Sequence, residues 1–122
     1  MHEMSLAMNI VALVCDRARA AGARQVEEVE LEVGSLSGVL AEALTFCFAA
    51  AAADTPAAGA RLLVREIEAL ARCLACGRDF PAASLVEPCP DCGGYATELI
   101  RGRELSVVSL TVDDEEKYNH VR

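Results

Sequence analysis

Four cysteines in the second half of the chain have the spacing of a metal site. Cys73, Cys76, Cys89 and Cys92 form two C-x2-C pairs that are separated by 12 residues. Each pair lets one tight turn present two thiolates to one ion, and two such turns complete a tetrahedron of sulfur ligands. Glycine follows each pair, and its access to positive φ lets backbone N–H groups turn toward the sulfurs. The spacing predicts a closed structural Zn²⁺ site, at which no hydrolysis is expected.

Two other kinds of site use cysteines in related ways. A redox dithiol needs only one C-x2-C pair on a βαβ frame, whereas an iron–sulfur cluster also takes four thiolates and has to be excluded by metal analysis. Zinc is favoured because a segment of about 30 residues builds too small a core to fold without a cross-link. The remaining cysteines, Cys15 and Cys47, lie on apolar helix faces and are interpreted as small buried hydrophobic residues.

The first three residues, Met1, His2 and Glu3, offer a second set of metal ligands. The α-amine, the His2 amide nitrogen and the His2 imidazole can close two fused chelate rings on Ni²⁺ or Cu²⁺, which favour planar nitrogen-rich sites. The Glu3 amide or carboxylate would be the fourth ligand. By chemistry alone, a solvated terminal histidine is the more common case, Cu²⁺ would bind more tightly than Ni²⁺, and Glu3 could instead serve the dipole of its helix.

Apolar periodicity predicts the elements around these two sets of ligands. The predicted helices cover residues 5–21 and about 15 residues after a turn at 34–38; the predicted strands cover 25–33, 61–71 and 104–114. A segment rich in glycine, proline and cysteine interrupts this pattern. The chain is therefore predicted to be α+β, with a small mixed sheet of about three strands and two helices (residues 1–71 and 103–122), and with an inserted zinc-ribbon-like module that carries the four cysteines (residues 72–102).

Composition excludes several classes of function. The formal net charge is −8 over 122 residues, and no basic cluster occurs, which argues against binding to nucleic acid or to an anionic membrane. No signal peptide or membrane span is recognised, so a cytoplasmic location is predicted. No nucleophile–base arrangement or phosphate loop is found, and the protein is predicted not to be an enzyme. Glu28, Glu30 and Glu32 could form a docking surface, although an ordinary wet strand face explains them more simply.

Three stretches together indicate a family. The initial "MHEMSLAMNIV", the segment "VELEVGSLSG" from Val29 and the late "CPDCGG" occur in an order and spacing that resemble the HypA/HybF family of nickel chaperones for [NiFe] hydrogenase maturation. The resemblance covers nearly the whole chain and is specific because the three motifs occur together. It implies transferable Ni²⁺ at Met1, His2 and Glu3, and structural Zn²⁺ on the four cysteines. It also implies a HypB-like GTPase and the precursor of the hydrogenase large subunit as partners.

The resemblance leaves some alternatives open. Some relatives also serve urease, a homodimer is compatible with the sequence, and the preference for nickel over copper comes from the resemblance alone. The main rival function is a zinc-ribbon adaptor that transfers no metal. Such an adaptor would share the four cysteines but would have no use for His2, so nickel titration of the untagged protein separates the two hypotheses.

Overall fold

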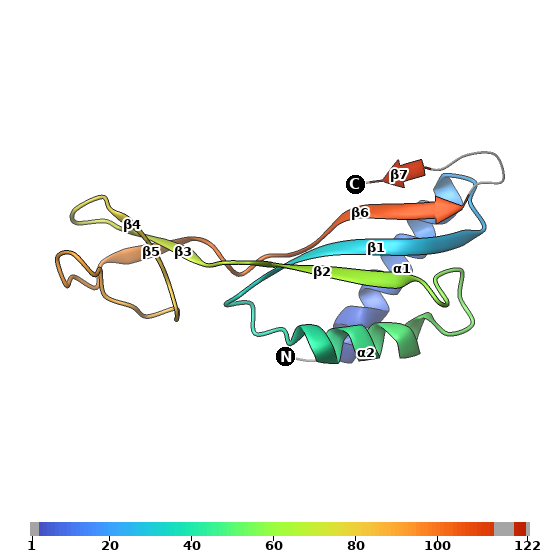
Figure 1. Ribbon diagram of the computed structural model, residues 1–122, viewed down its shortest axis with the longest axis horizontal. Coiled ribbons are helices and arrows are strands. Elements are labelled where there is room, and N and C mark those ends of the chain that lie inside the picture. The colour runs from blue at the N-terminus through green and yellow to red at the C-terminus, as the bar shows by residue number, and fades with distance from the viewer. Residues whose placement is uncertain (1–2, 114–118, 122) are drawn as a thin grey trace. The chain divides into compact units, whose positions relative to one another are not determined.

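The computed structural model describes residues 3–113 and the backbone of residues 119–121. It contains two helices, α1 (Glu3–Ala20) and α2 (Ala41–Ala52), and seven strands in its described part (Figure 1). The strands are β1 (Gln25–Gly34), β2 (Arg61–Ile67), β3 (Leu70–Cys73), β4 (Asp79–Pro81), β5 (Thr97–Arg101), β6 (Leu105–Asp113) and β7 (Asn119–Val121). None of the described helices is long and apolar enough to span a membrane.

The chain forms two compact units. The larger unit comprises Met1–Glu32, Val39–Arg65 and Ser106–Arg122, and the smaller unit comprises Val33–Gly38 and Glu66–Leu105. The predicted fold class is confirmed: the protein is α+β, with two helices and a separate small unit that carries the four cysteines. The assignment of one metal role to residues 1–71 and 103–122 and another to residues 72–102 stays a prediction.

The helices of the larger unit pack on each other through small and branched side chains. The buried face of α1 consists of Ala7, Ile10, Val11, Val14, Cys15 and Ala18, which recur at the helical period. In α2, Leu44, Phe48 and Ala52 are buried at a spacing of four residues. Amphipathic helices of this kind are stabilised mainly by burial of the apolar face rather than by intrinsic helix propensity.

The sheet of the larger unit has the strand order β2-β1-β6-β7. The side chains of β1 alternate, so that Val29 and Leu31 are buried while Glu28, Glu30 and Glu32 lie on the opposite face. Two ion pairs show that β1 and β2 run parallel. Arg61 pairs with Glu28, and further along both strands Arg65 pairs with Glu32. Strand β7, which the sequence analysis did not anticipate, pairs antiparallel with β6.

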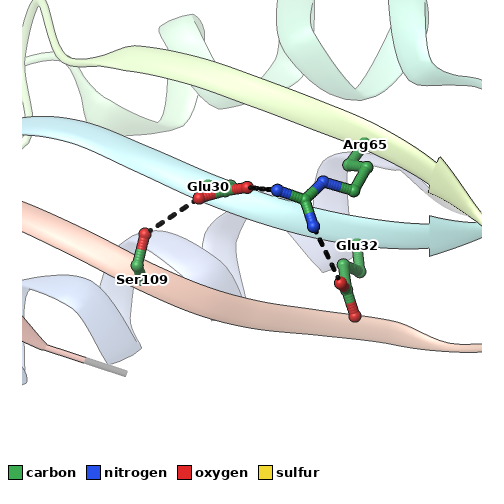
Figure 2. Close-up of polar contacts among 4 residues, drawn as sticks. All are labelled: Glu30, Glu32, Arg65 and Ser109. Atoms are coloured by element: carbon green, nitrogen blue, oxygen red, sulfur yellow. Dashed lines mark hydrogen bonds and ion pairs between the residues drawn. The ribbon is translucent and has the colours of Figure 1, made fainter.

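The acidic face of β1 is partly neutralised by its neighbours. Figure 2 shows Arg65 between Glu30 and Glu32, with nitrogen–oxygen distances of 2.7 and 3.5 Å, and Ser109 donating a hydrogen bond of 3.1 Å to Glu30. The three glutamates of this face expose only 24–29% of their side chains. Whether this face binds a partner stays a prediction, but it is less acidic than the glutamates alone would suggest.

The predicted strand 61–71 was wrong in one respect, because it is two strands that belong to different sheets. Strand β2 ends at Ile67, and β3 begins at Leu70 in a second sheet of order β4-β3-β5. Between them the backbone bonds to a loop: the Ile67 carbonyl accepts the Ser35 N–H at 2.8 Å, and the Ala69 N–H donates to Ser35 Oγ at 3.0 Å. Ser35 thus takes up backbone hydrogen bonds at the break between the two strands.

The smaller unit has a core of small residues. Its buried cluster consists of Ala69, Ala71, Cys73, Phe80, Ala82 and Cys89. Strand β3 pairs antiparallel with both β4 and β5 and forms the centre of this sheet. Gly34, the last residue of β1, has to be a glycine, because an added Cβ at this position would collide with the backbone of Gly102.

Candidate metal centre

Two similar turns present the four cysteines. In the first turn, the Gly77 N–H donates to the Cys73 carbonyl at 2.8 Å, and in the second the Gly93 N–H donates to the Cys89 carbonyl at 2.8 Å. Both glycines have positive φ, 79° and 74°, as the sequence predicted. A side chain at either position would be strained, so the glycines explain how four residues of chain can return two sulfurs to one point.

The sulfurs of the two turns lie close together. All four Sγ atoms are within 4.8 Å of one another, with 3.6 Å between those of Cys73 and Cys92 and 3.7 Å between those of Cys76 and Cys89. Four sulfurs bound at about 2.3 Å to one tetrahedral ion are roughly 3.8 Å apart, so these residues fit a single Zn²⁺. A cluster with several irons would hold the sulfurs farther apart, because each binds a different metal atom.

Burial and protonation differ among the thiols. Cys73 and Cys89 are buried, whereas Cys76 and Cys92 are exposed. The Cys76 backbone N–H lowers the pKa of Cys73 to about 7. The Arg78 N–H lowers the pKa of Cys76, but the sulfurs of Cys73 and Cys89 outweigh it and raise that pKa to about 11. Neighbouring sulfurs thus disfavour the thiolate form of Cys76, and a bound cation would stabilise it.

Ion pairs brace the turns from outside. Arg78 Nη1 lies 2.9 Å from Asp91 Oδ2 and so links the first turn to the second. Arg72 pairs with Asp79 at 2.8 Å across β3 and β4, and this hydrogen bond lowers the pKa of the Asp79 carboxyl. All four side chains are about half exposed, so each pair contributes little to stability and mainly orients the chain.

The predicted nickel ligands are only partly described. Met1 and His2 lie outside the described residues, and Glu3 is the first residue of α1. One oxygen of Glu3, Oε2, accepts the backbone N–H of Leu40 at 3.2 Å, at the beginning of α2. Sequence analysis missed this contact. No signal of it was present in the sequence, because Ser37 is a possible cap just before the second predicted helix, whereas the structure starts α2 after Leu40.

The four cysteines also stand out by comparison with the rest of the described chain. Among residues 3–113, they are the group of His, Cys, Asp or Glu side chains whose ligand atoms come close enough together to hold an ion. Cys15 is buried in α1 and Cys47 is half-buried in α2, so neither belongs to that group. The buried position of Cys15 agrees with its interpretation as a small hydrophobic residue.

Known proteins are similar to this chain in both sequence and fold. The family model described as "Hydrogenase/urease nickel incorporation, metallochaperone, hypA" matches residues 1–112. The hydrogenase maturation factor HypA of Chlorobaculum parvum is 49% identical over 113 residues, which cover 93% of this chain and 100% of that protein. The factor of the same name from Geobacter metallireducens is 42% identical over 113 residues, with the same coverage.

Solved structures support the fold independently. The solution structure of the Ni metallochaperone HypA from Helicobacter pylori has a TM-score of 0.63 at 21% identity, covering 90% of this chain and 96% of that one. A second solution structure, of a HypA protein, has a TM-score of 0.70 at 23% identity, covering 92% and 96%. From the family match and the close relatives, this chain belongs to the HypA family of hydrogenase/urease nickel incorporation metallochaperones.

Proposed function

We propose that this protein binds Ni²⁺ at its N-terminus and delivers it during maturation of a [NiFe] hydrogenase. The observation that carries the proposal is the family match, which begins at residue 1 and extends to residue 112. It therefore includes the Met-His-Glu start as well as the four cysteines. The relatives are named as hydrogenase maturation factors, whereas the family description also names urease, so hydrogenase is the favoured client.

Nickel is the cargo in this proposal, and its proposed ligands allow it to be released. The α-amine of Met1, the amide nitrogen and imidazole of His2, and a group of Glu3 hold the ion at a free chain end. An acceptor protein can replace these ligands one at a time, because no fold has to open first. The α-amine ordinarily titrates near ~7.7–8.0 and histidine near ~6.5, so protons displace the metal as the pH falls.

Zinc has a different role in this proposal. Cys73, Cys76, Cys89 and Cys92 would hold Zn²⁺, which when bound supplies a structural cross-link. The chain's own residues do the rest: the two glycine turns aim the sulfurs, and the buried pair of cysteines completes the core of the smaller unit. Four protein ligands leave no vacant coordination position, so no hydrolysis is expected at this metal.

The proposed partners follow from the family. They are a HypB-like GTPase, which supplies the nucleotide chemistry, and the precursor of the hydrogenase large subunit, and the proposed location is the cytoplasm. Nucleic acid and membranes are not proposed as partners, because the net charge is −8.

Nickel titration of the untagged protein tests the proposal. The wild type is expected to bind one Ni²⁺ with the absorption spectrum of a planar site. His2→Ala, or a tag placed before Met1, is expected to remove this binding while the zinc content stays the same. A zinc-ribbon adaptor would bind no Ni²⁺ tightly and would be indifferent to both changes, and that result would reject the chaperone function.

A further inference from the structure

Helix α2 begins without a cap of its own. Its N-cap residue is Leu40, whose backbone is extended (φ −91°, ψ 117°) and whose side chain makes no capping hydrogen bond. The Leu40 carbonyl already accepts the Leu44 N–H at 2.9 Å, as expected at a helix start. The first N–H groups of a helix have no partner within it, and leucine cannot supply an acceptor.

Glu3 supplies an acceptor from the other helix. Its Oε2 accepts the Leu40 N–H at 3.2 Å across a sequence separation of 37 residues. In a capping box, a glutamate at the third helical position reaches back to the N-cap N–H of its own helix. The third position of α2 is Ala43, which cannot do so. Glu3 therefore fills the place of the missing capping-box glutamate.

The packing of the helices directs Glu3 to this place. Ala7 is fully buried one turn after Glu3, and Ile10, Val11 and Val14 continue the same face. Residues four apart lie on one face of a helix, so Glu3 is at the head of the face that packs inward. Its carboxylate then meets the positive end of the α2 dipole, which favours a negative charge.

From this contact we infer that Glu3 is a positioning residue for the nickel-binding N-terminus, and that its carboxylate anchors α1 to the start of α2 instead of binding nickel. The inference rests on the proposed function. Met1 and His2 precede Glu3 directly, so the α-amine is joined to the anchor by about 7 Å of chain at most. Anchoring restricts the volume that the amine and imidazole can explore, and so reduces the entropy lost when they close around an ion.

Two substitutions at Glu3 in the untagged protein test this inference. The measurements are the Ni²⁺ dissociation constant, the absorption spectrum of bound Ni²⁺, and amide hydrogen exchange in the first turn of α2 in nickel-free protein. Glu3→Gln is expected to bind within about 3-fold of the wild type, because its side-chain oxygen can still accept the Leu40 N–H. Glu3→Ala is expected to bind about 10-fold more weakly and to exchange the first-turn amides about 5-fold faster. Both should keep the wild-type spectrum and zinc content.

A third substitution, at Leu40, separates the capping of α2 from the anchoring of the N-terminus. Leu40 is 68% exposed, so Leu40→Ser should be tolerated and should give α2 a cap of its own. Added to Glu3→Ala, it is expected to restore slow exchange at residues 41–44 but not the nickel affinity. Recovery of affinity in the double variant would overturn the anchoring role, because helix stability alone would then explain the loss.

Other results would also overturn the inference. If the carboxylate is a nickel ligand, Glu3→Gln will change the absorption spectrum and lose as much affinity as Glu3→Ala. Unchanged exchange in Glu3→Ala would show that the contact does not support α2. If the wild type binds no Ni²⁺, the proposed function fails, and hydrogen exchange then decides the Glu3–Leu40 contact by itself.

Discussion

The two units of the chain have cores of different kinds. In the larger unit the buried residues include several large apolar side chains, and the biggest are Phe48, Leu31, Leu44 and Leu110. In the smaller unit the buried cluster contains Phe80, three alanines and two of the four cysteines, and the partly buried Leu36 and Leu99 pack against it. Burial of a large apolar side chain contributes about 1.5–3 kcal/mol, and alanine contributes much less. Two of the four proposed zinc ligands, Cys73 and Cys89, are thus part of the core of the smaller unit, whereas the larger unit is expected to fold without a metal.

Removal of a buried cysteine should cause the largest loss of stability, and it should affect the smaller unit. Cys89→Ser is expected to lose zinc and to unfold residues 66–105, because structural zinc contributes about 10–16 kcal/mol of binding free energy. Native mass spectrometry measures the zinc content, and hydrogen exchange identifies the unfolded unit. Cys47→Ser is the matched control and should keep its zinc, since Cys47 lies in α2 outside the cluster. Full zinc retention by Cys89→Ser would contradict the comparison of the two cores.

A substitution that leaves a cavity in the larger unit should cause the next largest loss of stability. Phe48 is 2% exposed, so Phe48→Ala is expected to lower the free energy of unfolding by about 3–5 kcal/mol. Urea denaturation followed by circular dichroism measures this loss, and the zinc content should not change in protein that remains folded. Phe46 lies two residues away in α2 and is 76% exposed, so Phe46→Ala should change stability by no more than about 0.5 kcal/mol. Zinc loss from folded Phe48→Ala would show that the two cores are not independent.

Removal of the Glu104 carboxylate in the smaller unit should cause the smallest loss of stability, and this loss should depend on pH. The pKa of Glu104 is lowered by its own backbone N–H and by the Gly102 N–H, which donates at 2.6 Å. A lowered carboxyl pKa contributes stability that is present above the ordinary value of 4.5 and is lost as the pH falls through the lower value in the folded protein. Because the side chain is partly exposed and solvent weakens its interactions, Glu104→Gln should cost less than about 1 kcal/mol at neutral pH.

Hydrogen exchange around Gly102 measures this difference. The loss of stability in Glu104→Gln, relative to the wild type, is expected to be largest at neutral pH and to shrink as the pH approaches the carboxyl pKa. A deficit that stays constant with pH would show that the side chain acts through packing instead of charge.

Much of the fold could be predicted because its signals are local. The alternation of β1 and the periodicity of α1 correspond to one buried face each, and the structure confirms both. The division between β2 and β3 could not be predicted, because the backbone at the break bonds to Ser35, more than 30 residues away in the chain. Strand β7 was missed for a related reason, since a polar segment pairs only if β6 offers it a free edge.

The candidate site divides in the same way. Sequence alone determined that each C-x2-C pair with its glycine forms a tight turn, because the hydrogen bond that closes the turn joins residues only four apart. The spacing also predicted that the four sulfurs meet at one ion. Only the tertiary structure decided that Cys73 and Cys89 are buried while Cys76 and Cys92 are exposed, and that Glu3 lies at the start of α2. Contacts between distant residues depend on how whole elements pack, and no periodicity or spacing in the chain encodes that packing.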